Sequence, residues 1–135
     1  MASELELAAI LCSLILGGVS EDRVPLVAAG RETYVVPDCL TETHAVEVGL
    51  DTARGSLDSV QQAIFYGLET GRLPMVVIID TDGVEETVEM QIRRVARHLG
   101  VSYLTVDEDF LIRWQMTDYF RSRREHLFRA GSSSN

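Results

Sequence analysis

Lysine is missing from this chain, and all 12 of its cationic side chains are arginine. This absence excludes mechanisms that use a lysine as a base or as a Schiff-base nucleophile. Cysteine is scarce too: Cys12 and Cys39 lie far apart, with no CxxC or histidine-rich spacing around them. That spacing indicates neither a zinc site nor a disulfide framework, and we therefore expect a reducing, cytoplasmic setting.

The chain also lacks a hydrophobic run that could span a bilayer. The apolar run from Leu7 to Leu16 is too short, and Glu4 and Glu6 precede it where a signal peptide would need positive charge. We expect a buried amphipathic helix there, with Ser3 as its N-cap and Glu6 completing a capping box.

The net charge of −9 argues against a surface coated for tight, nonspecific phosphate binding. The charge is uneven, however: residues 1–90 carry 16 acids against 4 arginines, whereas residues 91–135 carry 5 acids against 8 arginines. We therefore expect any DNA contact to use the arginine-rich C-terminal third. The acidic half should bind DNA poorly alone, so a homodimer or a partner protein is expected to assist.

A chain of 135 residues that is 46% apolar fits one domain, here residues 1–130, with a disordered tail over 131–135. Antiparallel strands early and βαβ crossovers late predict an α/β fold, a mixed sheet flanked by helices. The expected strands are 23–28, 33–36, 43–50, 75–79 and 101–106, and the expected helices are 3–16, 57–69, 84–99 and a last one after Asp107. Side chains expected to pack include Phe65, Leu68, Phe110 and Phe120.

Two acids lie where neighbouring strands could bring them together. A hairpin closed by Thr41 and Glu42 would pair Asp38 with Ala45. Asp38 and Glu47 would then be diagonal neighbours on one face, roughly 7–8 Å apart at Cα. Two such carboxylates suit one hard cation, Mg²⁺ or Mn²⁺, but a register change of one residue would separate them.

The residues around this pair resemble the PD-(D/E)XK nuclease superfamily. Pro37-Asp38 is followed after eight residues by Glu47-Val48-Gly49, then by the helical Gln62-Ala63-Ile64-Phe65-Tyr66 and the buried strand 75–79. The order αβββαβ over roughly residues 1–80 is similar as well. The resemblance implies a restriction-endonuclease-like core with a C-terminal αβα extension, and Mg²⁺-dependent hydrolysis of nucleic acid.

The same resemblance assigns roles to individual residues. Asp38 and Glu47 would be metal ligands, Gln62 the helical support and Glu21 an additional metal-binding acid. The family's motif lysine is replaced by Gly49, and Arg54 is the nearest cation downstream. An arginine can orient water or stabilise developing negative charge, but it cannot act as a base.

Two alternatives remain open for this acid pair. The chain could be a catalytically inactive relative of the nucleases, acting as a binding or dimeric interaction module. Alternatively, Asp38 is a turn residue and Glu47 is the polar half of an alternating strand. Bound divalent ion and DNA cleavage would support the active reading.

A second motif is Ile79-Asp80-Thr81-Asp82-Gly83, which resembles the DxDG signature of haloacid-dehalogenase-type phosphotransferases. In that family the first aspartate is the nucleophile and the second is the acid/base. Such sites require a later basic residue and further acids, and only 52 residues follow Gly83, none of them lysine. A strand that ends in an Asx turn explains the same residues.

Overall fold

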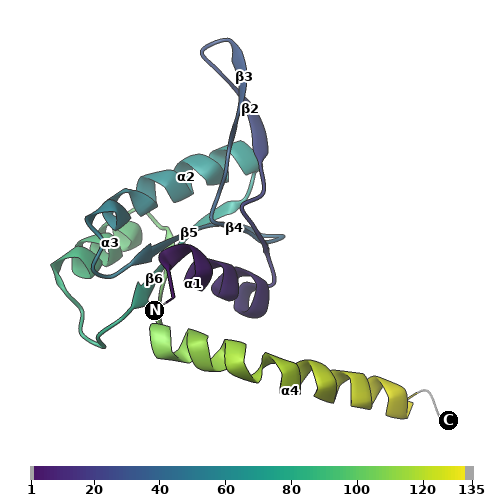
Figure 1. Cartoon of the computed structure of the whole chain (residues 1–135). Coiled ribbons are helices and arrows are strands. Elements are labelled where there is room, and N and C mark those ends of the chain that lie inside the picture. The colour runs from purple at the N-terminus through teal and green to yellow at the C-terminus, as the bar shows by residue number, and fades with distance from the viewer. Residues whose placement is uncertain (1, 133–135) are drawn as a thin grey trace.

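The computed structural model describes the backbone of residues 2–132 and the side chains of residues 2–124. Within that part of the chain, a five-stranded mixed sheet is flanked by helices, and a two-stranded sheet stands apart from it (Figure 1). The predicted α/β class is confirmed. The helices are α1 (Glu4–Ile10), the π-helix η1 (Leu11–Leu16), the 3-10 helix η2 (Arg54–Asp58), α2 (Ser59–Thr70), α3 (Thr87–His98) and α4 (Glu108–Ser132). The strands are β1 (Val19–Ser20), β2 (Val24–Ala28), β3 (Arg31–Val35), β4 (Cys39–Leu40), β5 (His44–Leu50), β6 (Leu73–Asp80) and β7 (Ser102–Asp107).

The large sheet has the strand order β1-β4-β5-β6-β7. β4 runs antiparallel to β5, whereas β6 and β7 continue the sheet in parallel with β5. Parallel neighbours need crossover connections, which α2 and α3 supply. As a result the carboxyl ends of β5, β6 and β7 lie along one edge of the sheet.

Two apolar cores cover the two faces of this sheet. One joins α1, η1 and α4 to the sheet, and the other joins α2 and α3 to it. Val76, Val77, Ile78 and Ile79 of β6 are all fully buried, which confirms the expected strand buried on both faces. β5 is buried on both of its faces, so Glu47 does not lie on an exposed polar side of the strand.

The strand pairing differs from the expected hairpin. Arg31–Val35 pairs with β2, and the segment after Pro37 forms the separate strand β4 beside β5. Pro37 has no backbone N–H, so the chain changes sheet at this residue. Leu40 lies opposite Ala45 rather than Thr43, a shift of two residues that keeps side chains on the same faces.

The cysteines also differ from expectation, because Cys12 and Cys39 form a disulfide with their Cα atoms 5.5 Å apart. It ties η1 to β4, and both residues are fully buried. Folding brings together two positions 27 residues apart, which no local spacing reveals. The inference of a reducing, cytoplasmic setting from cysteine spacing therefore loses its support.

Several aromatic and apolar side chains expected in the core are exposed. On α2, Leu68 is 76% and Phe65 41% exposed. On α4, Phe110 is 48% exposed, and Phe120 is 69% exposed on the half of the helix that extends away from the body (Figure 1). The tail expected over 131–135 begins inside α4, and residues 133–135 lie outside the described residues. Across residues 2–132, no helix is long and apolar enough to cross a membrane.

Candidate functional site

The register of β4 and β5 brings Asp38 and Glu47 together. Cys39 pairs with Val46, so Asp38, one residue earlier, lies directly opposite Glu47 instead of diagonal to it. Two hydrogen bonds hold the pair: the Asp38 N–H donates to Glu47 Oε1 at 3.4 Å, and the Val48 N–H donates to Asp38 Oδ2 at 2.8 Å. The two carboxyl groups are therefore held by backbone geometry.

Both side chains line a polar pocket of about 280 Å³. Glu47 is only 5% exposed and Asp38 is half-buried, whereas Glu4 and Gln62 are exposed. The pocket collects side chains from α1, β5, η2 and α2. Its lining residues are Glu4, Asp38, Glu47, Val48, Ala53, Gly55, Ser56, Ser59 and Gln62. Three carboxyl groups thus share a pocket in which the lining residues include no arginine.

Electrostatics in this pocket favour protonated Glu47 when no cation is present. Burial, hydrogen bonding with the Asp38 side chain and the charge of Asp38 raise the pKa of Glu47 to about 9. A carboxyl with so high a pKa carries a proton at neutral pH. A divalent cation in the pocket would reverse this balance, because it stabilises the ionised carboxylate.

The neighbouring groups respond to the same concentration of negative charge. Burial and then the charge of Asp38 raise the pKa of Glu4. Burial, followed by the charges of Glu47 and Asp38, raises the pKa of Tyr66 on α2. Burial contributes most to both shifts, and the pocket carboxyls add to them.

Of the other candidate residues, Gln62 lines the pocket of Asp38 and Glu47, whereas Arg54 and Glu21 do not. Gln62 lines the pocket from α2. Arg54 is exposed on η2 and is not among the lining residues, although its neighbours Ala53 and Gly55 are. Glu21 lines an adjacent pocket with Asp38, so Glu4 is the third acid of this one.

Gly49, where the resemblance to PD-(D/E)XK nucleases leads us to expect a lysine, has no room for a side chain. A Cβ there would lie 2.5 Å from Ser56 Oγ and 2.8 Å from Ser56 Cβ. Ser56 is held in place because its hydroxyl donates to the Leu50 carbonyl at 2.8 Å. Ser56 thus occupies the space beside Gly49, and the pocket is built without a cation at this point.

The donor set of the pocket fits a hard divalent cation. Carboxylates and an amide offer only oxygen ligands, which Mg²⁺ and Mn²⁺ prefer. Asp38, Glu47 and Glu4 could supply charged oxygens, while Gln62 could supply a neutral one.

A second group of acids lies at the carboxyl ends of β5 and β6. Among the described residues, Asp51, Asp80, Asp82 and Glu89 each offer a ligand atom within 4.8 Å of the others, and they could hold a metal ion. Asp51 and Glu89 are 1% and 2% exposed. This group contains the DxDG aspartates.

Backbone and hydroxyl donors already contact these acids. Asp51 accepts from the Thr81 N–H and hydroxyl, both at 2.9 Å. Asp80 Oδ1 accepts from the N–H groups of Asp82 and Gly83 at 3.0 and 2.8 Å. Those last two contacts form the Asx turn that the sequence allowed as an alternative.

Sequence reasoning missed Asp51 and Glu89. The sequence did contain a signal for Asp51. This residue directly follows β5, Asp80 ends β6, and strands joined by a helical crossover run parallel and end at the same edge of the sheet. Glu89 had no such signal. It lies in the first turn of α3, where its Oε1 accepts from the Glu86 N–H at 3.4 Å.

The C-terminal arginines are dispersed and partly engaged within the chain. Arg93 of α3 forms an ion pair at 2.7 Å with Glu85, which precedes the helix. On α4, the Arg121 guanidinium lies 3.8 Å from the centroid of the Trp114 ring, and Arg123 donates to the Tyr119 hydroxyl at 2.8 Å. The lining residues of the Asp38 pocket include no residue of α4.

Known proteins give no further guide to this site. Comparisons of the chain with protein-family models, with curated proteins and with solved structures found no match.

Proposed function

We propose that this chain hydrolyses phosphodiester bonds of nucleic acid with the help of a divalent cation, Mg²⁺ or Mn²⁺, bound in the Asp38 pocket. One observation carries the proposal. Asp38 and Glu47 face each other across β4 and β5 in a pocket with a third acid, Glu4, and no arginine among its lining residues. Glu47 is the buried acid of the group, and without a cationic partner it must either carry a proton or bind a metal ion.

A divalent cation supplies the chemistry that the side chains lack. When bound, it neutralises charge on the phosphate oxygens and lowers the pKa of coordinated water. Asp38 and Glu47 would hold the cation, and Glu4 would replace Glu21 as the additional acid. Gln62, exposed at the pocket, can orient the phosphate or the attacking water by hydrogen bonding.

Arg54 has a place at the rim in this proposal. Its side chain is exposed beside Ala53 and Gly55, which line the pocket. A guanidinium there can contact a substrate phosphate, but its pKa keeps it charged, so it cannot be the base. The general base is then either a pocket carboxylate or solvent.

The test is cleavage of fluorescent single- and double-stranded DNA and RNA with Mn²⁺, together with calorimetry of Mn²⁺ binding. We expect Asp38→Asn and Glu47→Gln to remove cleavage and to weaken Mn²⁺ binding. The loss should exceed about a hundredfold, since even a group behind a metal ligand contributes ~10–100-fold. Asparagine keeps the acceptor for the Val48 N–H, so the fold should survive.

Asp80→Asn is the matched control. It removes one charge from the other acid group and keeps an acceptor for the N–H groups of Asp82 and Gly83. Cleavage by Asp80→Asn should equal that of the unmodified protein. If Asp38→Asn still cleaves DNA or RNA but Asp80→Asn does not, the active site lies at the other acid group, and the proposal is wrong.

A second candidate is an inactive nuclease-like protein that serves as a binding module. The packing of Ser56 against Gly49 favours it, because the motif lysine cannot be accommodated without moving Ser56. This candidate predicts that DNA or a protein partner binds equally well with and without Mn²⁺. Cleavage lost on Glu47→Gln would exclude it.

The aspartate-nucleophile phosphatase is a third candidate, favoured by the convergence of Asp51, Asp80, Asp82 and Glu89. It predicts phosphate release from a small phosphomonoester and beryllofluoride binding at Asp80. The Asx turn weighs against it, since both donors point at the oxygen of the would-be nucleophile.

A further inference from the structure

The hairpin formed by β2 and β3 projects from the body of the protein (Figure 1). It is a sheet of only two strands, with five residue pairs from Val24–Val35 to Ala28–Arg31. Val27 is 70% and Tyr34 50% exposed. An isolated hairpin is marginally stable in water, and its unpaired edges are templates for another strand.

The turn determines which backbone groups face outward. Ala29 and Gly30 have φ values of 52° and 76°, as a two-residue type I′ turn requires. Ala28 and Arg31 are then a hydrogen-bonded pair, and bonded and non-bonded pairs alternate along the ladder. Consequently the N–H and C=O groups of Glu32 and Tyr34 point away from β2.

The two outer edges of the hairpin differ. On β2 the corresponding outward positions are Pro25 and Val27. Pro25 has no N–H, so this edge lacks a donor where a new strand would need one. On β3 both outward positions carry a donor and an acceptor, and residues Arg31–Tyr34 are exposed. Only the β3 edge can take up another strand with a complete ladder.

The side chains on this edge are self-complementary. An antiparallel copy of β3 with its two-fold axis at Thr33 places Glu32 opposite Tyr34 of the second copy. The Arg23 guanidinium lies 4.5 Å from the centroid of its own Tyr34 ring, on the same side of the strand. Glu32 therefore faces the Tyr34 ring that the second copy's Arg23 overlies, so the pairing brings opposite charges to the same side of the interface.

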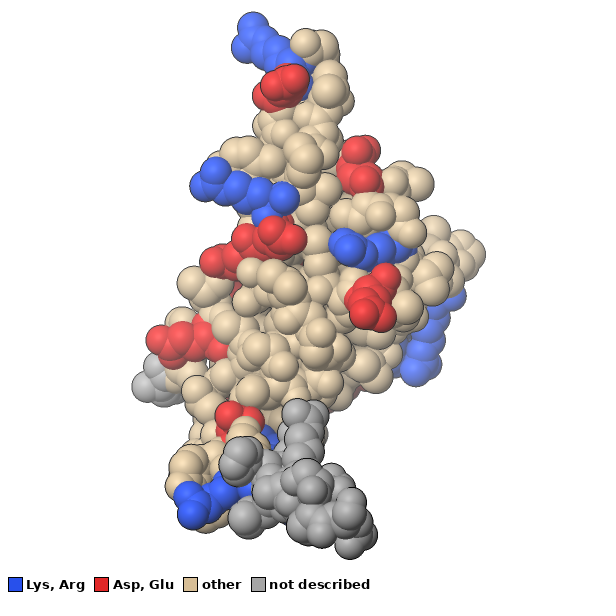
Figure 2. Space-filling model, turned by 90° about the vertical axis from the view of Figure 1, so that its right-hand side faces the viewer, with Lys and Arg blue, Asp and Glu red and all other residues tan. Residues whose placement is uncertain are grey.

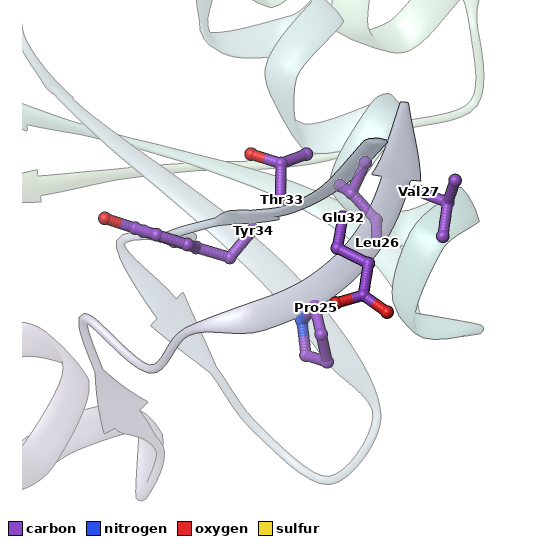
Figure 3. Close-up of a pocket in the computed structure, with 6 residues that line it drawn as sticks. All are labelled: Pro25, Leu26, Val27, Glu32, Thr33 and Tyr34. Carbon is purple, nitrogen blue, oxygen red and sulfur yellow. The ribbon is translucent and has the colours of Figure 1, made fainter. Parts of the chain in front are cut away.

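The surroundings of the edge suit such a pairing. The close-up of the hairpin shows the Tyr34 phenol extending away from the Pro25, Leu26 and Val27 side chains (Figure 3). These residues and Glu32 and Thr33 line an open groove of about 490 Å³. Figure 2 shows basic and acidic side chains next to each other in small groups, one of them at the tip of the hairpin, with uncharged surface between the groups.

We propose that the chain forms a two-fold homodimer by antiparallel pairing of β3 with β3 of a second copy, with Thr33 on the axis and the opposite charges of Glu32 and Arg23 on either side. This interface is independent of the proposed hydrolysis, because none of its residues lines the Asp38 pocket.

The first test is molar mass in solution, by light scattering after gel filtration at micromolar concentration. The unmodified protein should have twice the mass of one chain. Glu32→Pro removes an outward donor of β3 and leaves the bonded pairs with β2 intact, so it should be monomeric. Val27→Pro is the matched control on the opposite edge and should remain dimeric.

A charge exchange and a cross-link test the register. Glu32→Arg should yield monomer, and adding Arg23→Glu should restore the dimer. Thr33→Cys should form an intermolecular disulfide, because facing non-bonded residues have Cα atoms about 4.5 Å apart. Leu26→Cys, on the same face of β2 but three strand spacings from its copy, should not cross-link.

Two results would overturn the proposal. One is a monomeric unmodified protein, which would leave the edge to a different partner or to solvent. The other is a dimer that survives both Glu32→Pro and Glu32→Arg, which would place the interface elsewhere on the molecule.

Discussion

At the scale of single residues, Glu47 links pH to stability. Its pKa rises on folding from 4.5 to about 9, so the folded state binds the proton more tightly than the unfolded state does. This contribution to stability is complete below about pH 4.5 and is lost progressively as the pH rises toward 9. The neutral isostere Glu47→Gln should escape this loss.

We therefore expect Glu47→Gln to melt higher than the unmodified protein near pH 8, by roughly 5 °C or more, and to melt at a similar temperature near pH 4. Thermal unfolding followed by circular dichroism in metal-free buffer checks this. A constant difference at every pH would mean that the carboxyl ionises normally in the fold.

The same proton should compete with a metal ion. Below its pKa, Glu47 must release a proton before it can bind a cation, so Mn²⁺ affinity should rise about tenfold per pH unit near neutrality. Added Mn²⁺ should stabilise the unmodified protein more than it stabilises Glu47→Gln, which binds the ion more weakly.

Residue-level chemistry explains why part of the site could be predicted and part could not. A two-residue error in register preserves which side chains share a face, so Asp38 and Glu47 still come together. Glu4 was missed because its approach to β5 depends on the tertiary packing of α1. The space occupied by Ser56 beside Gly49 has no sequence signature at all.

At the scale of elements, local sequence signals predict where helices begin and end, whereas tertiary contacts determine which strands share a sheet. The capping box of Ser3 and Glu6 and the left-handed Gly71 at the end of α2 follow from short-range chemistry. The tight turn at Gly30 indicates that β3 pairs with β2, but no local signal shows that β3 and β4 belong to different sheets. The separation of β3 from β4 depends on Pro37, whose effect on pairing is visible only once the sheet is assembled.

The disulfide is the strongest connection between elements near the site. Cys39 follows Asp38 directly, and Cys12 belongs to η1, which continues from the helix that carries Glu4. The bond therefore couples β4 to the helical segment that supplies the third acid. Reduction should loosen both the fold and the pocket.

Replacing both cysteines, Cys12→Ser with Cys39→Ser, should lower the free energy of unfolding by about 3–4 kcal/mol, the chain-entropy value for a loop of this length. Urea denaturation under oxidising conditions measures the loss. Adding a reductant should destabilise the unmodified protein and have no effect on the double variant. Equal stability of the two proteins would show that the cysteines are reduced in the native state.

At the scale of the whole molecule, charge separates the proposed site from the C-terminal third, where the sequence leads us to expect a DNA contact. The pocket lies in the first two thirds of the chain, residues 1–90, which have a charge balance of −12, while the C-terminal third has +3. α4 carries exposed Arg113 and Arg123 on a helix that extends away from the sheet (Figure 1). If α4 holds a nucleic acid, its arginines and the metal ion would neutralise the phosphate charge. The lining residues of the pocket, which include no arginine, would not.

This division of roles predicts a separable effect of the arginines. In an Asp38→Asn background that prevents cleavage, Arg113→Gln with Arg123→Gln should weaken duplex binding and lower the salt slope of log K by about 1.8, or ~0.9 per lost phosphate contact. Fluorescence anisotropy across a salt series measures both quantities.

Arg93→Gln is the control, because Arg93 is already paired with Glu85, and its slope should not change. In the cleaving protein the two α4 substitutions should raise KM and leave kcat intact, since neither side chain reaches the Asp38 pocket. An unchanged slope would remove α4 from the nucleic-acid contact.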